Sequence, residues 1–185
     1  MRLRTKLGTA AALALAATML AISAHAQVRN SAASPIALNA VLNQSLTVTL
    51  SGNAVNFNLV AGSANNLGST TITATTSWTL TQTIGVVSLY AYFTSSTSAL
   101  TDGAGHFIPS SSFQLSDNGG AFNPLTSTVP FGGANAGVPV SYTLILGNNK
   151  SSRTDIMKFN INLSPLPSLP PGNYTGTLTV QAQAI

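Results

Sequence analysis

Asp102, His106 and the serines at 110–112 come nearest to a catalytic set in this sequence. A serine nucleophile, a histidine base and an aspartate that orients the histidine would catalyse acyl transfer. Such a nucleophile needs a sharp, rigid turn of the Gly-x-Ser-x-Gly kind, whereas these serines lie in a Ser-rich stretch of low complexity. We therefore interpret His106 as a structural or solvent-exposed residue, assign no catalytic residue and predict that the protein is not an enzyme.

Metal and cofactor sites have equally little support. Zinc needs three or four His, Cys or carboxylate ligands, but the chain has no Cys and, after residue 26, only His106 and no Glu. The stretch 117–120, Asp-Asn-Gly-Gly, lacks the spaced oxygens and the closing Glu of a calcium loop and is better explained as a turn. We expect no metal and no cofactor.

The first residues of the chain have the features of an export signal. Three basic residues precede an apolar run at 10–22, and Ala24-His25-Ala26 is a small-residue cleavage site. We predict that residues 1–26 form a signal peptide and that the mature chain is exported. Because a membrane-spanning helix needs about 20 apolar residues, we expect no transmembrane segment.

The net charge of +4 and the pI near 9.9 come largely from this signal. After cleavage, four basic residues face three aspartates, which leaves a net charge of +1. No basic patch with interleaved aromatic residues exists, so we expect no nucleic-acid partner. A mature domain without Cys has no disulfides and must be held by apolar burial and sheet hydrogen bonds.

From Ser34 onward, short runs alternate apolar and polar residues and are separated by Gly- and Asn-containing turns. This pattern predicts an all-β fold, an immunoglobulin-like antiparallel β-sandwich, with a β-barrel or jelly roll as the alternative. We expect an N-terminal extension at 27–43 and one sandwich domain at 44–185. The predicted strands cover 36–42, 46–50, 55–60, 71–80, 85–93, 113–115, 138–146, 157–163 and 174–185.

The last predicted strand follows the turn Pro170-Pro171-Gly172-Asn173. From Tyr174 onward, apolar or small residues fall on one face and Thr or Gln on the other. This turn, aromatic residue and Thr-rich strand resemble the end of bacterial chaperone-usher pilus subunits, above all the cysteine-free colonisation-factor type, and of spore-coat-protein-U-like secreted domains. The resemblance covers about sixteen residues at this end and, more loosely, the N-terminal extension.

The resemblance implies a sandwich that lacks its seventh strand, with a groove that the extension of a neighbouring subunit fills as a donor strand. It implies a homopolymeric fimbria or pilus on the cell surface, reached through the periplasm with a periplasmic chaperone and an outer-membrane usher. The sequence Gln-Ala-Gln-Ala-Ile at 181–185 departs from the aromatic-rich pattern of many pilins, which puts chaperone binding at that strand in doubt. The implied donor residues are Ile36, Leu38, Ala40 and Leu42, and the implied groove-wall residues are Tyr174, Leu178 and Val180.

Two alternatives remain open at this point. The extension is equally well explained as an ordinary first strand that pairs within its own subunit. The protein would then be a self-complete sandwich that binds carbohydrate or another surface ligand. Tyr90 and Tyr92 would be the candidate sugar platform, because they lie on the face opposite Leu89, Ala91 and Phe93, although packing within the second sheet explains them as well.

Overall fold

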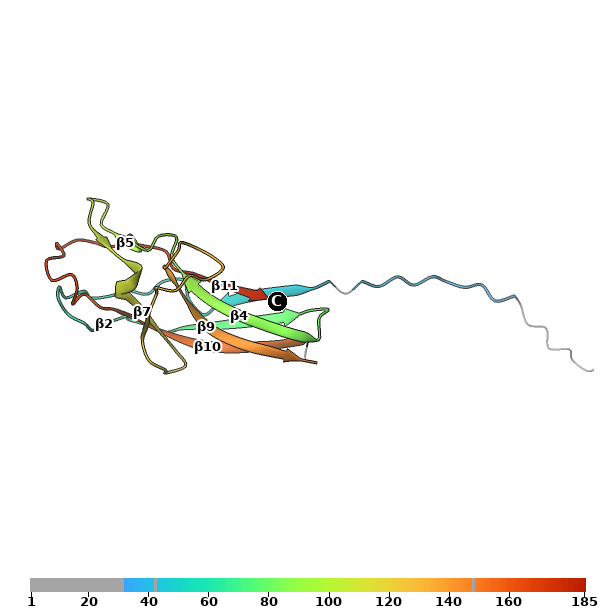
Figure 1. The fold of residues 1–185 in the computed structure, drawn as a ribbon. Coiled ribbons are helices and arrows are strands. Elements are labelled where there is room, and N and C mark those ends of the chain that lie inside the picture. Colours follow the sequence, from blue (N-terminus) through green and yellow to red (C-terminus); the bar gives the residue numbers. More distant parts are fainter. Residues whose placement is uncertain (1–31, 42, 148) are drawn as a thin grey trace, which may run out of the picture. The chain divides into compact units, whose positions relative to one another are not determined.

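The computed structural model describes residues 32–41, 43–147 and 149–185 (Figure 1). The chain divides into two units, Met1–Ala40 and Val41–Ile185, each described by itself. The predicted signal peptide and the predicted donor residue Leu42 lie outside the described residues. In the first unit, residues 32–40 carry no assigned strand and are exposed. The strand predicted at 36–42 is therefore not assigned at its described positions.

The unit Val41–Ile185 is an antiparallel β-sandwich, as the alternating sequence pattern predicts. One sheet has the strand order β1-β3-β10-β7-β8, with β2 also paired to β10; the other has the order β11-β4-β9; β5 and β6 form a small hairpin. The strands are β1 (Ser45–Leu50), β2 (Asn66–Leu67), β3 (Ile72–Thr79), β4 (Ile84–Tyr92), β5 (Leu100–Thr101), β6 (Phe107–Ile108), β7 (Phe113–Asp117), β8 (Asn123–Pro124), β9 (Gly137–Leu146), β10 (Lys150–Ile161) and β11 (Thr179–Ala184).

The core lies between the two sheets and is built by the period-two pattern of each strand. On β3, Ile72, Ala74, Thr76 and Trp78 are buried, whereas Thr73, Thr75 and Ser77 between them are more exposed. Leu89 and Ala91 on β4 and Met157 on β10 are likewise buried. Burying one large aliphatic side chain contributes about 1.5–3 kcal/mol, so a chain without disulfides can be held by this core.

Phe113, at the start of β7, is the centre of an aromatic group in the core. Its ring lies 5.1 Å from that of Phe93, 5.7 Å from that of Phe57 and 5.9 Å from that of Phe159. The contacts with Phe57 and Phe93 are edge-to-face, the arrangement that aromatic rings favour. Phe93, Phe113 and Phe159 form part of the floor of the open groove described below, and Phe57 lies on one of its walls.

The structure corrects three strand boundaries. β10 begins at Lys150, seven residues before the predicted start at Met157. The segment 55–60 pairs only through a bridge between Phe57 and Gly68 and is no full strand. The last ladder begins at Thr179 and not at Tyr174, because Thr175 exchanges hydrogen bonds with Thr101 of the β5–β6 hairpin.

Candidate functional site

A groove of about 740 Å³ lies between two extended segments of the sandwich. One wall is the segment from Leu50 to Leu59, which follows β1. The other wall runs from Gly172 to Val180 and leads into β11. The floor is formed by apolar core residues, which are Ile72, Phe93, Leu100, Phe113, Met157, Phe159 and Ile161.

We call the second wall, together with the strand β11 into which it leads, the β11 wall. It presents apolar side chains that face inward and are not fully covered. Leu178, Val180 and Ala182 pack against the core but remain only half-buried. On the neighbouring strand β4, the inward-facing Leu89 and Ala91 are at most 1% exposed. The contrast between adjacent strands of one sheet shows that the apolar surface of β11 is left open on the groove side.

The backbone of the same wall is also unpaired on that side. Ile185 exchanges both of its backbone hydrogen bonds with Val86 of β4. Because the direction of the backbone groups alternates along an antiparallel strand, the amides and carbonyls of Leu178, Val180 and Ala182 point away from β4. Among the described residues, no backbone hydrogen bond reaches these three from the groove side.

The opposite wall repeats this arrangement. Val55, Phe57 and Leu59 pack half-buried against the core, whereas Asn56 and Asn58 between them are exposed. The carbonyl of Asn56 accepts a hydrogen bond from the amide of Ser69, so the backbone groups of Phe57 point the other way, toward the groove. No described residue pairs with the backbone of Val55, Phe57 or Leu59 on the groove side.

The groove therefore has the chemistry of a vacant strand position. It offers rows of unpaired amides and carbonyls on both walls and an apolar floor between them. An extended peptide whose alternate side chains are apolar would satisfy both features at once, as in β-strand addition to an exposed sheet edge.

All three residues predicted as groove wall, Tyr174, Leu178 and Val180, line this groove. The hydroxyl of Tyr174 donates a 2.9 Å hydrogen bond to the carbonyl of Pro170, which fixes the ring at the mouth of the groove. Burial raises the pKa of the Tyr174 hydroxyl above its ordinary value of 10.0, and the negative charge of nearby Asp102 acts in the same direction. Tyr174 therefore stays neutral near neutral pH and presents an apolar ring.

The predicted donor residues belong to the other unit, except Leu42, which is outside the described residues. Ile36 and Leu38 are 84% and 90% exposed, and Ala40 is exposed as well. Folded proteins usually bury large aliphatic side chains, so the exposure of both Ile36 and Leu38 is uncommon. These residues have no apolar partner within the described part of their own unit.

The second wall and the floor were not predicted as site residues. The alternation of Val55, Phe57 and Leu59 is visible in the sequence and predicts a strand there. It does not show that one edge of the segment is unpaired, because that depends on which strands neighbour it in three dimensions. The floor residue Phe113 lies far along the chain from both walls and gives no local signal.

Asp102 and His106 lie together, as their spacing allows, with a 2.6 Å contact between Nδ1 of His106 and a carboxylate oxygen of Asp102. This hydrogen bond, aided by the amides of Ala104 and His106, lowers the pKa of Asp102 below its ordinary value of 3.8. No described contact joins His106 to the serines at 110–112. The hydroxyl of Ser110 is instead bonded to the carbonyl of Asn135. Asp102 and His106 therefore close the turn between β5 and β6, and the described residues form no Ser-His-Asp arrangement.

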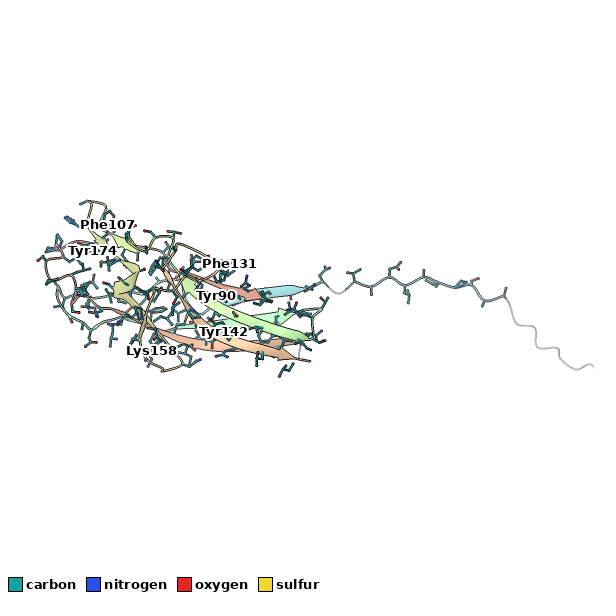
Figure 2. All side chains as sticks on the ribbon, in the orientation of Figure 1. Tyr90, Phe107, Phe131, Tyr142, Lys158 and Tyr174 are labelled. Atoms are coloured by element: carbon teal, nitrogen blue, oxygen red, sulfur yellow. The ribbon has the colours of Figure 1, made fainter. Side chains whose placement is uncertain are left out.

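Tyr90 and Tyr92, the candidate sugar platform, lie on the outer face of the β11-β4-β9 sheet, where both rings contact Phe131; Figure 2 shows Tyr90 and Phe131. Tyr90 is only 8% exposed and meets Phe131 and Tyr142 edge-to-face. The hydroxyl of Tyr92 donates a 2.7 Å hydrogen bond to Gln181. Both rings contact Phe131, and Tyr90 is buried beneath its neighbours, so Tyr90 presents no open face for stacking on a sugar.

The stretch 117–120 forms a turn, with Asn118 and Gly119 at positive φ. Within the described residues, no group of three potential metal ligands is found. The same part of the chain has no helix of the length and apolarity that a membrane span requires. A comparison of the chain with protein-family models, with curated proteins and with solved structures finds no match.

Proposed function

We propose that this protein is a structural subunit that assembles into a fibre by strand donation. The extension of one copy would enter the groove of the next copy and complete its sandwich. The observation that carries the proposal is the groove itself, which has half-buried apolar side chains and unpaired backbone groups on both walls. Apolar burial and main-chain hydrogen bonds along an exposed edge are what drive β-strand addition.

The extension has the side-chain pattern that the groove requires. Ile36, Leu38, Ala40 and Leu42 fall on one face of an extended chain, with Ala37, Asn39 and Val41 between them and Pro35 before them. Seven extended residues span about 23 Å at 3.3 Å per residue, which is the length of a full strand. The apolar residues would face the floor, while the backbone would pair with Val180 on one wall and Phe57 on the other.

Insertion into another copy is favoured over insertion into the same copy by the short connection to β1. Only Asn43 and Gln44 separate Leu42 from Ser45, the first residue of β1. A two-residue hairpin favours residues that take positive φ at both positions, but Gln44 is not at positive φ. Such a hairpin would also lay the extension along β1, whereas the groove lies beyond Leu50.

The direction of insertion follows from where the strands begin and end. Ser45 pairs with Thr79, and the connection from Thr79 to Ile84 lies beside Ile185, so β1 begins at the end of the sandwich where β11 finishes (Figure 1). If the inserted extension ran parallel to β11, it would leave the groove at this same end. The accepting copy's own extension also starts there, so the copy that donates to it and the copy that it donates to would both have to lie at one end. Antiparallel insertion leaves at the Gly172 end and gives a head-to-tail fibre.

The cellular side of the proposal rests on the sequence resemblance. Residues 1–26 would direct export, and a periplasmic chaperone would occupy the groove until an outer-membrane usher assembles the fibre at the cell surface. Such capping suits a subunit whose edge would otherwise pair without control, since an open apolar strand edge promotes aggregation.

A matched pair of substitutions in the extension tests the proposal. Leu38→Asp puts a charge on the groove-facing side, and Asn39→Asp puts the same charge on the opposite side. We expect mature Asn39→Asp to form long polymers in light scattering and Leu38→Asp to stay monomeric. A synthetic peptide of residues 27–42 should bind the Leu38→Asp protein and raise its melting temperature. If both variants and the unmodified protein are equally monomeric, the protein is a self-complete module and the proposal is wrong.

A further inference from the structure

A contiguous apolar patch lies on the outer face of the β11-β4-β9 sheet, at the end where the extension joins β1. It consists of Ile84, Leu144, Leu146 and Ile185, whose side chains are between 69% and 78% exposed. Ile84 stands directly opposite Leu146 in the ladder, and Ile185 pairs with Val86, whose other neighbour is Leu144. The four side chains therefore share one face in adjacent rows. We call them the end patch.

The end patch is not an exposed region of the core. Ile145, between Leu144 and Leu146, is fully buried, and Val87 is buried on the same inner side. The inward-facing residues of β4 and β9 are thus already buried in the core, and the large aliphatic residues of the end patch lie on the opposite, outer face. Adjacent exposed aliphatic residues of this kind mark a contact surface.

From this arrangement we propose that the end patch docks against a second copy of this chain, the copy whose groove holds the extension. This inference rests on the proposed function. The short connection limits how far apart the two copies can lie, because Asn43 and Gln44 are the only residues between the donor segment and β1. Three residue steps span at most about 11 Å, so the accepting copy must lie directly against the end of the sandwich that carries the patch.

The opposite end of the sandwich offers an apolar counterpart. Val60 follows the groove-wall residue Leu59, and Phe107 lies in the hairpin that pairs with Thr175 of the other wall. Both Val60 and Phe107 are exposed. In Figure 2, Phe107 and Tyr174 both lie toward the end of the sandwich away from the last residue of β11. The contact would therefore be heterologous, with the end patch of one copy against the groove mouth of the next.

The test separates the patch from the groove by using two measurements on the mature full-length protein. The double variant Ile84→Ser/Leu146→Ser removes two patch side chains. The control Ile156→Ser removes a side chain that is 45% exposed on the other sheet. Binding of a peptide of residues 27–42 reports on the groove, and polymer growth in light scattering reports on the whole junction.

We expect peptide affinity to stay within about twofold for all three proteins and polymer growth of the double variant to fall at least about tenfold, since buried aliphatic contacts carry much of an interface's energy. The control should grow like the unmodified protein. Normal growth of the double variant, with peptide binding intact, would overturn the inference and leave the proposed function standing. The inference is also overturned if the double variant polymerises normally but no longer forms side-by-side dimers or no longer binds a chaperone, because the end patch would then contact a different partner.

If the peptide fails to bind the unmodified protein, the proposed function fails and the inference falls with it. Circular dichroism of each variant checks the fold, and the single variant Leu144→Asn gives a second measure of the patch should the double variant misfold.

Discussion

Ser141 on β9 donates a 2.7 Å hydrogen bond to the fully buried carboxylate of Asp155 on β10, and so joins the two sheets on the side away from the groove. Nε of Arg153 donates to the same carboxylate at 2.8 Å, and its Nη1 donates to the carbonyl of Tyr142 on β9. The sandwich is therefore fastened along one side by charge-assisted hydrogen bonds, while the other side is open. This asymmetry is what lets a groove exist in an otherwise well-packed domain.

Removing the arginine from this group should destabilise the fold. We expect Arg153→Met to lower the free energy of unfolding by about 3 kcal/mol, because it leaves a buried carboxylate without its cationic partner. Urea unfolding followed by tryptophan fluorescence measures the change. Lys158→Met, an exposed cation on the same strand, is the control and should change stability by less than about 0.5 kcal/mol. Equal effects of the two substitutions would show that Arg153 acts only as a surface charge.

Asp117 should make the fold less stable at neutral pH than at acid pH. Burial raises the pKa of Asp117 above its ordinary value of 3.8, and the nearby charge of Asp155 raises it further. A raised pKa means that the fold prefers the protonated carboxyl, so the stability it contributes is present below pH 3.8 and is lost as the pH rises through the folded-state pKa.

We therefore expect Asp117→Asn to raise the melting temperature at neutral pH and to leave it almost unchanged well below pH 3.8. The gain should correspond to less than about 1 kcal/mol, because the side chain is partly exposed. Thermal unfolding at the two pH values measures it. A gain of the same size at both would mean that charge is not the cause.

A charge on the groove wall should block the donor peptide. We expect Val180→Asp to weaken binding of a peptide of residues 27–42 by about 100-fold, the cost of burying an unpaired charge against an apolar strand. Gln183→Asp puts the same charge on the outer face of the same strand and should leave affinity nearly unchanged. Fluorescence anisotropy of a labelled peptide measures both. If the two variants bind equally well, the peptide does not enter the groove.

Gly176 should be required for the shape of the β11 wall. A Cβ at this position would overlap the carbonyl oxygen of Ala99, whereas a Cβ at Gly172 would lie 3.4 Å from its nearest neighbour, Cβ of Asp102. We expect Gly176→Ala to cost about 2 kcal/mol and Gly172→Ala to be nearly neutral. Hydrogen exchange of the Thr101 and Thr175 amides would show whether the wall separates from the hairpin. Unchanged exchange in Gly176→Ala would contradict the steric argument.

Local alternation was enough to predict the all-β sandwich and strands such as β3, where one face is more deeply buried than the other. It also predicted β4 and β9, although both faces of β4 are buried from Val87 to Ala91. It missed the first half of β10, where Ser151, Arg153 and Asp155 are polar and interrupt the alternation of apolar residues. The buried carboxylate of Asp155 is satisfied by Arg153 two residues away on β10, by Ser141 on β9 and by Asn118 in the turn after β7, so two of its three partners come from other parts of the chain. A polar core residue of this kind has no signature in its own segment.

The groove was only partly predicted for the same reason. Tyr174, Leu178 and Val180 stand out because their strand follows a Pro-Gly turn and alternates strictly. Phe57 and its neighbours alternate just as well, but an alternating segment looks the same whether both of its edges are paired or one is open. Whether a strand edge is paired depends on residues far away in the sequence. The burial of Tyr90 under Phe131 depends on such distant residues as well.

The two-residue junction at Asn43 and Gln44 has a mechanical consequence for a fibre built in this way. Tension along such a fibre would pull the inserted segment lengthwise past Val180 and Phe57, so all of its main-chain hydrogen bonds would resist in shear together and would not break in succession. A connection this short also leaves little room for bending between neighbours. The filament would therefore be stiff and would tend to hold under load, although no covalent bond crosses its joints.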